Sequence, residues 1–166
     1  YTAPPLRFVY RGLGEIPHLL AGVMFPGWGY FILTGALTLD LLIFAIPFGL
    51  LGLTVILNFE IPDREADLHG EKQNLIVKKG RYFGFATVFS LYLMTLLYFM
   101  ILTAVSWSEN TLNFLVISLL CLIPVFVSST AVIKKPIQQQ EATTYAIRNA
   151  VAGFLTTFLI MVTLIF

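Results

Sequence analysis

Four carboxylates fall within eight residues in the middle of the chain, directly after a long apolar run. They belong to the segment Asn58-Phe59-Glu60-Ile61-Pro62-Asp63-Arg64-Glu65-Ala66-Asp67. On a helix, Asp63 and Asp67 lie one turn apart on one face, and Glu60 precedes Asp63 by three residues. Pro62 suits the first turn of a helix, so we expect a local helix that begins there. Carboxylates this close repel one another, which predicts a compensating cation.

Mg²⁺ is the cation that best fits this cluster. It binds through one or two carboxylates and fills the rest of its coordination sphere with water and substrate phosphate oxygens. The basic residues that follow the cluster offer donors for those phosphates: Lys72, Lys78, Lys79 and Arg81. The alternative is an ordinary charged loop between two membrane spans, in which Lys78, Lys79 and Arg81 only fix the topology and Arg64 and Glu65 are merely solvated.

A second segment with candidate binding residues opens the chain. It reads Tyr1-Thr2-Ala3-Pro4-Pro5-Leu6-Arg7-Phe8-Val9-Tyr10-Arg11-Gly12-Leu13-Gly14-Glu15. Arg7 and Arg11 can clamp a diphosphate, because a guanidinium donates two parallel hydrogen bonds to phosphate oxygens. Tyr1, Phe8 and Tyr10 equally fit the belt of aromatic residues at a lipid–water interface.

The composition places these segments in a membrane protein. Charged residues make up 11% of the 166 residues, and the mean hydropathy is +0.86. An ordinary soluble domain carries about 25% charged residues, so this chain has too few to cover a soluble surface. A net charge of +1 also argues against a nucleic-acid partner. Cys121 is the only cysteine, which excludes an internal disulfide and a cysteine-based metal site.

Five stretches contain no Asp, Glu, Lys or Arg, and each is about as long as a membrane-spanning helix. They are residues 16–39, 41–59, 82–108, 110–133 and 149–166. Backbone groups must pair internally in a bilayer, and these stretches lack the alternation of barrel strands. We therefore expect an all-α, polytopic transmembrane helix bundle with five spans. Pro26 and the glycines beside it predict a kink or a break in the first span.

All basic residues fall on one side of the membrane if each stretch spans once. The N-terminal segment, residues 60–81 and residues 134–148 contain every Lys and Arg. The other side holds residues 38–40 and a turn at Ser108–Glu109, with acids only. The positive-inside rule makes the basic side cytoplasmic, in what we expect to be the cytoplasmic (inner) membrane. Residues 60–81 would then form the one long polar connection, and such connections tend to be functional.

Together, the two polar segments resemble the UbiA superfamily of membrane prenyltransferases. The opening segment, which ends in Arg11-Gly12-Leu13-Gly14-Glu15, resembles the stretch between the fourth and fifth helices of that family. The segment Asp63-Arg64-Glu65-Ala66-Asp67, followed by Lys72, Leu75 and Lys79-Gly80, resembles its second aspartate-rich motif. The motifs follow the family's order, and the resemblance covers residues 1–166. Their wording is most similar to members that act on 1,4-dihydroxy-2-naphthoate in menaquinone biosynthesis.

This resemblance implies a fold and a reaction. The five spans would be the C-terminal part of a single domain, a nine-helix bundle around a cavity that opens to lipid. The domain would transfer a prenyl group from an isoprenoid diphosphate, through an allylic carbocation, to a lipophilic, quinone-type aromatic acceptor. The implied Mg²⁺ ligands and catalytic residues are Asp63 and Asp67. The implied diphosphate-binding residues are Lys72, Arg7 and Arg11, with Asn58 and Tyr10 as weaker substrate contacts.

The chain departs from the family's pattern in two places. After the second aspartate the family usually reads Gly-Lys-Arg-Thr-Leu, where this chain reads Glu71-Lys72-Gln73-Asn74-Leu75. The lysine is kept, but the glycine comes one place early, at Gly70. The first aspartate-rich motif, Asn-Asp-x-x-Asp, does not occur in the sequence. We therefore expect an N-terminal half, linked or separate, to complete the site, and this chain alone to be inactive.

Two other classes of function compete with the enzyme. A transport or channel module would carry ionisable residues inside its spans, where the five stretches hold only His18. An inactive membrane scaffold would keep the fold without the chemistry. The presence together of Asp63, Asp67 and Lys72 argues against a scaffold.

Overall fold

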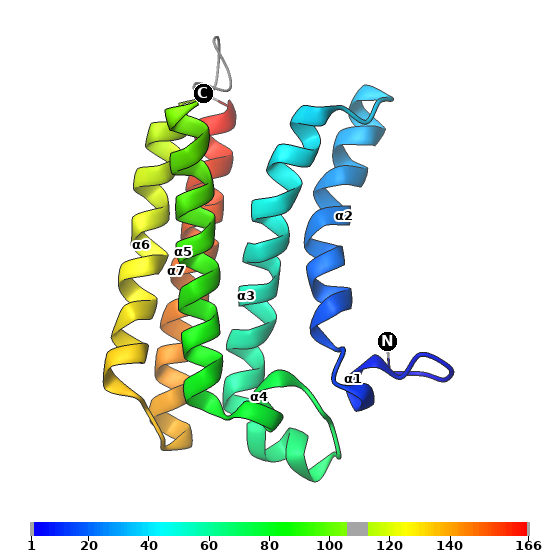
Figure 1. Cartoon of the computed structure of the whole chain (residues 1–166), viewed down its shortest axis with the longest axis vertical. Coiled ribbons are helices and arrows are strands. Elements are labelled where there is room, and N and C mark those ends of the chain that lie inside the picture. The colour runs from blue at the N-terminus through cyan, green and yellow to red at the C-terminus, as the bar shows by residue number, and fades with distance from the viewer. Residues whose placement is uncertain (1, 106–112, 166) are drawn as a thin grey trace.

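The computed structural model describes residues 2–105 and 113–165, and all of the regular structure in that part of the chain is helical (Figure 1). Five helices are long and apolar enough to cross a membrane: α2 (Glu15–Thr34), α3 (Leu39–His69), α5 (Arg81–Ala104), α6 (Phe114–Lys134) and α7 (Gln139–Ile165). Two short helices, α1 (Phe8–Arg11) and α4 (Leu75–Lys79), lie at one end of the bundle. The prediction of an all-α bundle with five spans is confirmed.

Consecutive long helices run antiparallel, with α3 at the centre (Figure 1). α3 packs against α2, α5 and α7, and α6 packs against α5 and α7. The N-terminal segment, α4 and the turn between α6 and α7 all lie at the same end, which we call the basic end. The Ser108–Glu109 turn, predicted for the opposite end, lies outside the described residues.

The helices at the basic end are longer than the apolar stretches. α3 continues through Pro62 to His69, so the prediction that a new helix begins at Pro62 is wrong. Proline removes only one backbone donor. The neighbouring Ile61 is fully buried, so tertiary packing keeps α3 helical through Pro62. α7 begins at Gln139, well before the predicted stretch. The expected long polar connection is therefore mostly helix, and only residues 70–74 separate α3 from α4.

The first span also differs from its prediction. α2 passes through Pro26 as one unbroken helix, so the expected break does not occur. Pro17 lies in the first turn, where a missing N–H costs little because that donor has no partner within the helix. None of the residues of α2 is buried.

Glycines bring α2 close to α3. A Cβ on Gly22 would lie 2.9 Å from the carbonyl oxygen of Phe48 and 3.0 Å from Cα of Gly49. Opposite it, a Cβ on Gly52 would lie 3.2 Å from Cα of Gly22. In a bilayer, helices gain little from excluding lipid, so this close approach of small residues supplies the packing that holds them together. The contact between α2 and α3 therefore depends on residues that have no side chain.

The other contacts of α3 are with a well-packed core. Toward the basic end, Ile61 and Phe85 are fully buried in a cluster that includes Tyr92. Tyr92 of α5 donates a hydrogen bond to the carbonyl oxygen of Asn149 on α7 at 3.0 Å. Gly153 leaves room for the Tyr92 ring, since a Cβ there would collide with it. These contacts fix α3 between α5 and α7 and so fix the position of its polar end.

We predict that Gly22→Leu loosens α2 from α3. A leucine would meet the backbone of α3, and overpacking of this kind costs about 1–3 kcal/mol. The expected result is a lower thermal unfolding midpoint in detergent micelles, measured by scanning fluorimetry. Gly29→Leu is the matched control, because a Cβ on Gly29 of the same helix meets no atom within 4 Å. Equal midpoints for the two variants would contradict the role of the glycine contact.

Candidate functional site

The last turns of α3 present three carboxylates to one small cavity, which we call the acidic cavity. Glu60, Asp63 and Asp67 line it, together with Lys72 and Asn74 from the turn that follows α3. The rest of its lining is Val9, Gly14, Ile56 and Phe59. Its volume is about 120 Å³. Although no helix begins at Pro62, the expected sharing of one helix face by these carboxylates holds, because α3 is continuous there.

Asp67 is the most enclosed of these carboxylates, with 6% of its surface exposed. Its Oδ1 lies 2.5 Å from Nζ of Lys72, and its Oδ2 accepts a hydrogen bond of 2.8 Å from Nδ2 of Asn74. The backbone N–H of Lys72 donates to the carbonyl oxygen of Asp67 at 3.0 Å. Both carboxylate oxygens are therefore paired, and the turn is folded back onto the end of α3.

The other two carboxylates have fewer partners. Oε2 of Glu60 is buried and has no hydrogen-bond partner among the described residues. Burial of a carboxylate oxygen without a donor is costly, and either a cation in the cavity or a proton on Glu60 would relieve that cost. No described group of three His, Cys, Asp or Glu side chains is close enough to hold a metal by itself. Mg²⁺ does not need such a group when substrate phosphates and water supply the remaining oxygens.

Glu15 joins the N-terminal segment to the turn. Its Oε1 accepts a hydrogen bond of 2.5 Å from the backbone N–H of Leu75, at the start of α4. The N–H of Gln73 donates to the carbonyl oxygen of Val9 at 3.0 Å, and Oδ1 of Asn74 caps α4. The position of Lys72 thus depends on the N-terminal segment, which is distant in sequence. Sequence reasoning did not single out Glu15 or Asn74, although the capping preference of asparagine was a usable signal for Asn74.

Arg81 and Glu65 serve the fold rather than a ligand. Arg81 pairs with Glu65 and donates to the carbonyl oxygens of Ile61 and Ile137, both at 3.2 Å. Arg64 lies 3.6 Å from Glu65 and donates to a carbonyl oxygen of α4 at 3.3 Å. The interpretation of Arg64 and Glu65 as merely solvated is therefore wrong. These contacts join α3 to α4, α5 and the turn before α7.

Arg7, Tyr10 and Arg11 line a different cavity, which we call the basic cavity. Its lining also includes Gln73 and Lys78, and its volume is about 700 Å³. Leu68 and Glu71 complete it. The residues expected to bind a diphosphate are therefore divided, since Lys72 lines the acidic cavity and the two arginines line the basic one.

Asn58 lines neither polar cavity. It is 2% exposed, and its Nδ2 donates to the carbonyl oxygen of Thr54 at 2.9 Å. Its Oδ1 is buried and has no hydrogen-bond partner among the described residues. Asn58 thus lies within the packed bundle rather than among the residues around the carboxylates.

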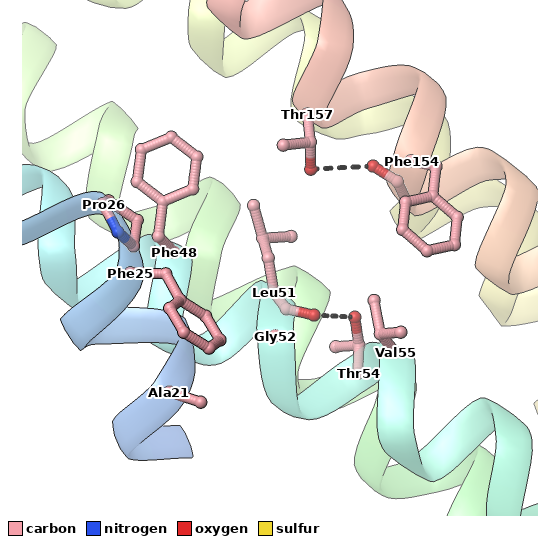
Figure 2. Close-up of a pocket in the computed structure, with 12 residues that line it drawn as sticks. Ala21, Phe25, Pro26, Phe48, Leu51, Gly52, Thr54, Val55, Phe154 and Thr157 are labelled. Atoms are coloured by element: carbon pink, nitrogen blue, oxygen red, sulfur yellow. Dashed lines mark hydrogen bonds between the residues drawn. The ribbon is translucent and has the colours of Figure 1, made fainter. Parts of the chain in front are cut away.

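An apolar pocket of about 220 Å³ lies between α2, α3 and α7 (Figure 2). Phe25, Phe48 and Phe154 contribute large aromatic surfaces to it. The hydroxyls of Thr54 and Thr157 donate to carbonyl oxygens of their own helices at 2.7 and 2.9 Å, so neither brings an unpaired donor to the pocket.

Successive stretches of α3 line the apolar pocket and the acidic cavity. Val55 lines the apolar pocket, and Ile56, the next residue, lines the acidic cavity. Asp63 follows Val55 by two helical turns, about 12 Å along the axis. Residues of an apolar site and of a charged site therefore follow one another along a single helix.

Comparison with known families bears directly on this arrangement. The model of the UbiA prenyltransferase family matches residues 1–154, which include every residue of both polar cavities. The chain belongs to the UbiA prenyltransferase family. No curated protein and no solved structure matches it. Members of the family are membrane prenyltransferases that generally use Mg²⁺, so this integral membrane protein is assigned to the transferases that move a prenyl group to a lipophilic acceptor.

We predict that Glu15→Ala loosens the turn that carries Lys72. The substitution removes the acceptor for the N–H of Leu75, and a hydrogen bond to a charged group contributes about 1.5–3 kcal/mol. Hydrogen exchange of residues 70–79, measured by mass spectrometry, should become at least roughly tenfold faster. Glu15→Gln keeps an acceptor oxygen and should restore most of the protection. Unchanged exchange in Glu15→Ala would show that this contact does not hold the turn.

Proposed function

We propose that this chain contributes one of two sets of carboxylates to the active site of an Mg²⁺-dependent prenyltransferase. The enzyme transfers a prenyl group from an isoprenoid diphosphate to a lipophilic aromatic acceptor. The observation that carries this proposal is that successive stretches of α3 line an apolar pocket and a cavity of carboxylates. A substrate with a charged head and an isoprenoid tail has the same division along its length.

The residues of the acidic cavity fit Mg²⁺. Asp63 and Asp67 would hold the ion, and Glu60, whose Oε2 has no hydrogen-bond partner among the described residues, lines the same cavity. Hard carboxylate oxygens are the ligands that this ion prefers. When bound, Mg²⁺ supplies positive charge that stabilises the departing diphosphate.

Lys72 is the proposed diphosphate-binding residue at this cavity. In the structure its ammonium neutralises Asp67 at 2.5 Å. With an ion held by Asp63 and Asp67, Lys72 would be available to turn from Asp67 to a phosphate oxygen of the substrate. An ammonium forms strong, charge-assisted hydrogen bonds to such oxygens. The same side chain would thus stabilise the empty site and bind the leaving group.

The apolar pocket is the proposed site for part of the isoprenoid tail. Its aromatic side chains, Phe25, Phe48 and Phe154, offer an apolar surface that keeps water from the tail. The acceptor is proposed from the sequence alone. The wording of the two motifs favours 1,4-dihydroxy-2-naphthoate and hence a step in menaquinone biosynthesis.

The proposed active enzyme contains a second set of carboxylates. Two aspartates and a lysine hold an ion and a diphosphate weakly, and the first aspartate-rich motif of the family does not occur in this sequence. We propose that an N-terminal half, covalently linked or separate, supplies it, and that this chain alone is inactive. By the positive-inside rule, the basic end and its two polar cavities would face the cytoplasm.

Neutral replacement of the aspartates tests this proposal. In the complete enzyme, Asp63→Asn and Asp67→Asn should each lower prenyl transfer at least about 100-fold, since each removes a charge on which the metal depends. Both variants should also lose binding of Mn²⁺, followed by electron paramagnetic resonance. Glu141→Gln, at an exposed position of α7, is the control and should keep both properties. Full turnover in either aspartate variant would refute the metal assignment.

Replacement of Lys72 separates diphosphate binding from the metal. Lys72→Ala should raise the KM for the isoprenoid diphosphate roughly tenfold or more, as expected for the loss of a hydrogen bond to a charged group. Mn²⁺ binding should persist, because the aspartates are intact. Lys72→Arg should recover most of the affinity. An unchanged KM in Lys72→Ala would remove this residue from the site.

A further inference from the structure

Besides the acidic and basic cavities, the basic end holds a further charged cavity, which we call the interfacial cavity. Residues from the last turns of α3, the start of α5 and the turn that joins α6 to α7 line it, and these segments meet at the basic end (Figure 1). Its volume is about 360 Å³. Four cations line it: Arg64, Lys79, Arg81 and Lys135. None of its residues lines the acidic or the basic cavity, so it is a separate candidate site.

The cations of this cavity fall into two kinds. Arg64 and Arg81 share the carboxylate of Glu65, one guanidinium on each of its oxygens, and both also donate to backbone carbonyl oxygens. Within the described part of the chain, neither Lys79 nor Lys135 forms an ion pair. Like charges gathered around one opening raise the local potential and attract anions. The two lysines are therefore available for an anionic ligand, whereas the arginines hold the fold.

Two contacts hold the turn after α6 against the start of α5. Arg81 donates to the carbonyl oxygen of Ile137 at 3.2 Å. Nζ of Lys135 lies 5.2 Å from the centre of the Tyr82 ring, a contact that orders the ammonium without neutralising its charge. The position of Lys135 is thus set before any ligand binds, which lowers the entropic cost of binding.

The cavity lies where the apolar stretches of two helices end. Tyr82 is the first residue of the stretch 82–108, and the stretch 110–133 ends two residues before Lys135. Phospholipid headgroups lie at this depth, where the hydrocarbon core gives way to water. Tyr82 and Ile137 also line the cavity, and they are 49% and 83% exposed. A ligand with both an anionic group and acyl chains would cover them, whereas a soluble phosphate would leave them in water.

We propose that the interfacial cavity binds an anionic phospholipid. Lys79 and Lys135 donate to the phosphate oxygens of its headgroup through charge-assisted hydrogen bonds, and Tyr82 and Ile137 contact the glycerol and the upper part of an acyl chain. Basic pockets between membrane helices are suited to such headgroups. The alternative is that the lysines only fix the topology, a role that requires their charge but no bound lipid. The proposal does not depend on the prenyl-transfer reaction.

Native mass spectrometry of the full-length protein in detergent micelles tests the proposal. Phosphatidylglycerol and phosphatidylcholine with the same acyl chains are titrated separately, and the Kd of the first bound molecule is measured. K79Q/K135Q should weaken phosphatidylglycerol binding about 25-fold, since each lysine near an anionic lipid contributes about fivefold. Its affinity for phosphatidylcholine should change no more than about twofold, because that headgroup has no net charge. Ile137→Gln should weaken phosphatidylglycerol binding about threefold or more through the lost apolar contact.

K134Q/R148Q is the matched control. It removes the same charge from exposed positions of α6 and α7 outside the cavity, and phosphatidylglycerol affinity should stay within about twofold of the unmodified protein. Lys79, Lys135 and Ile137 are also exposed, so their variants should keep the thermal unfolding midpoint measured without added lipid.

Two outcomes would overturn the proposal. If both double variants lose the same affinity, or neither loses any, the lysines of the cavity do not hold the lipid and the topology role remains. Glycerol 1-phosphate, which has the phosphate without acyl chains, should bind at least about 100-fold more weakly than phosphatidylglycerol. Equal affinities for these two ligands would show a site for a soluble phosphate instead of a lipid.

Discussion

The charged end of the molecule is organised around the buried carboxylate of Asp67. A carboxylate with 6% exposure needs partners, and it has them in Lys72 and Asn74. By pairing with both, it folds the turn after α3 back onto that helix. The same turn separates the acidic cavity from the basic one. The electrostatic requirement of one side chain therefore determines where the binding groups lie.

The apolar half of the molecule follows a different constraint. Inside a bilayer, lipid solvates apolar helices as well as other helices do, so packing must come from close approach. Gly22 and Gly52 provide it between α2 and α3, and Gly153 admits the ring of Tyr92 between α5 and α7. The apolar pocket lies beside these contacts, because the same three glycines line it. The glycines thus shape a site to which they contribute no functional group.

The presence of both charged cavities and an apolar pocket is consistent with membership of the UbiA family. A prenyl donor has a charged diphosphate and an apolar tail, and α3 lines an apolar pocket and a cavity of carboxylates in succession. The basic residues of the fold have separate tasks. Arg64 and Arg81 hold helices together, Lys72 neutralises a carboxylate, and the cations of the basic cavity have no carboxylate partner among the described residues.

The sequence by itself determined that the chain lies in a bilayer, which stretches cross it, and which carboxylates share one face of a helix. Apolar runs of about 20 residues dictate helices in a bilayer, and the spacing of Glu60, Asp63 and Asp67 places their side chains together on any helix, whatever packs against it. Only the tertiary structure decided that α3 continues through Pro62, because the burial of Ile61 overrides a local preference. It also placed Arg7 and Arg11 at a different cavity from Lys72. It brought Glu15 into contact with the turn that follows α3. Contacts between distant segments depend on how the chain folds back, and residue spacing carries no information about that.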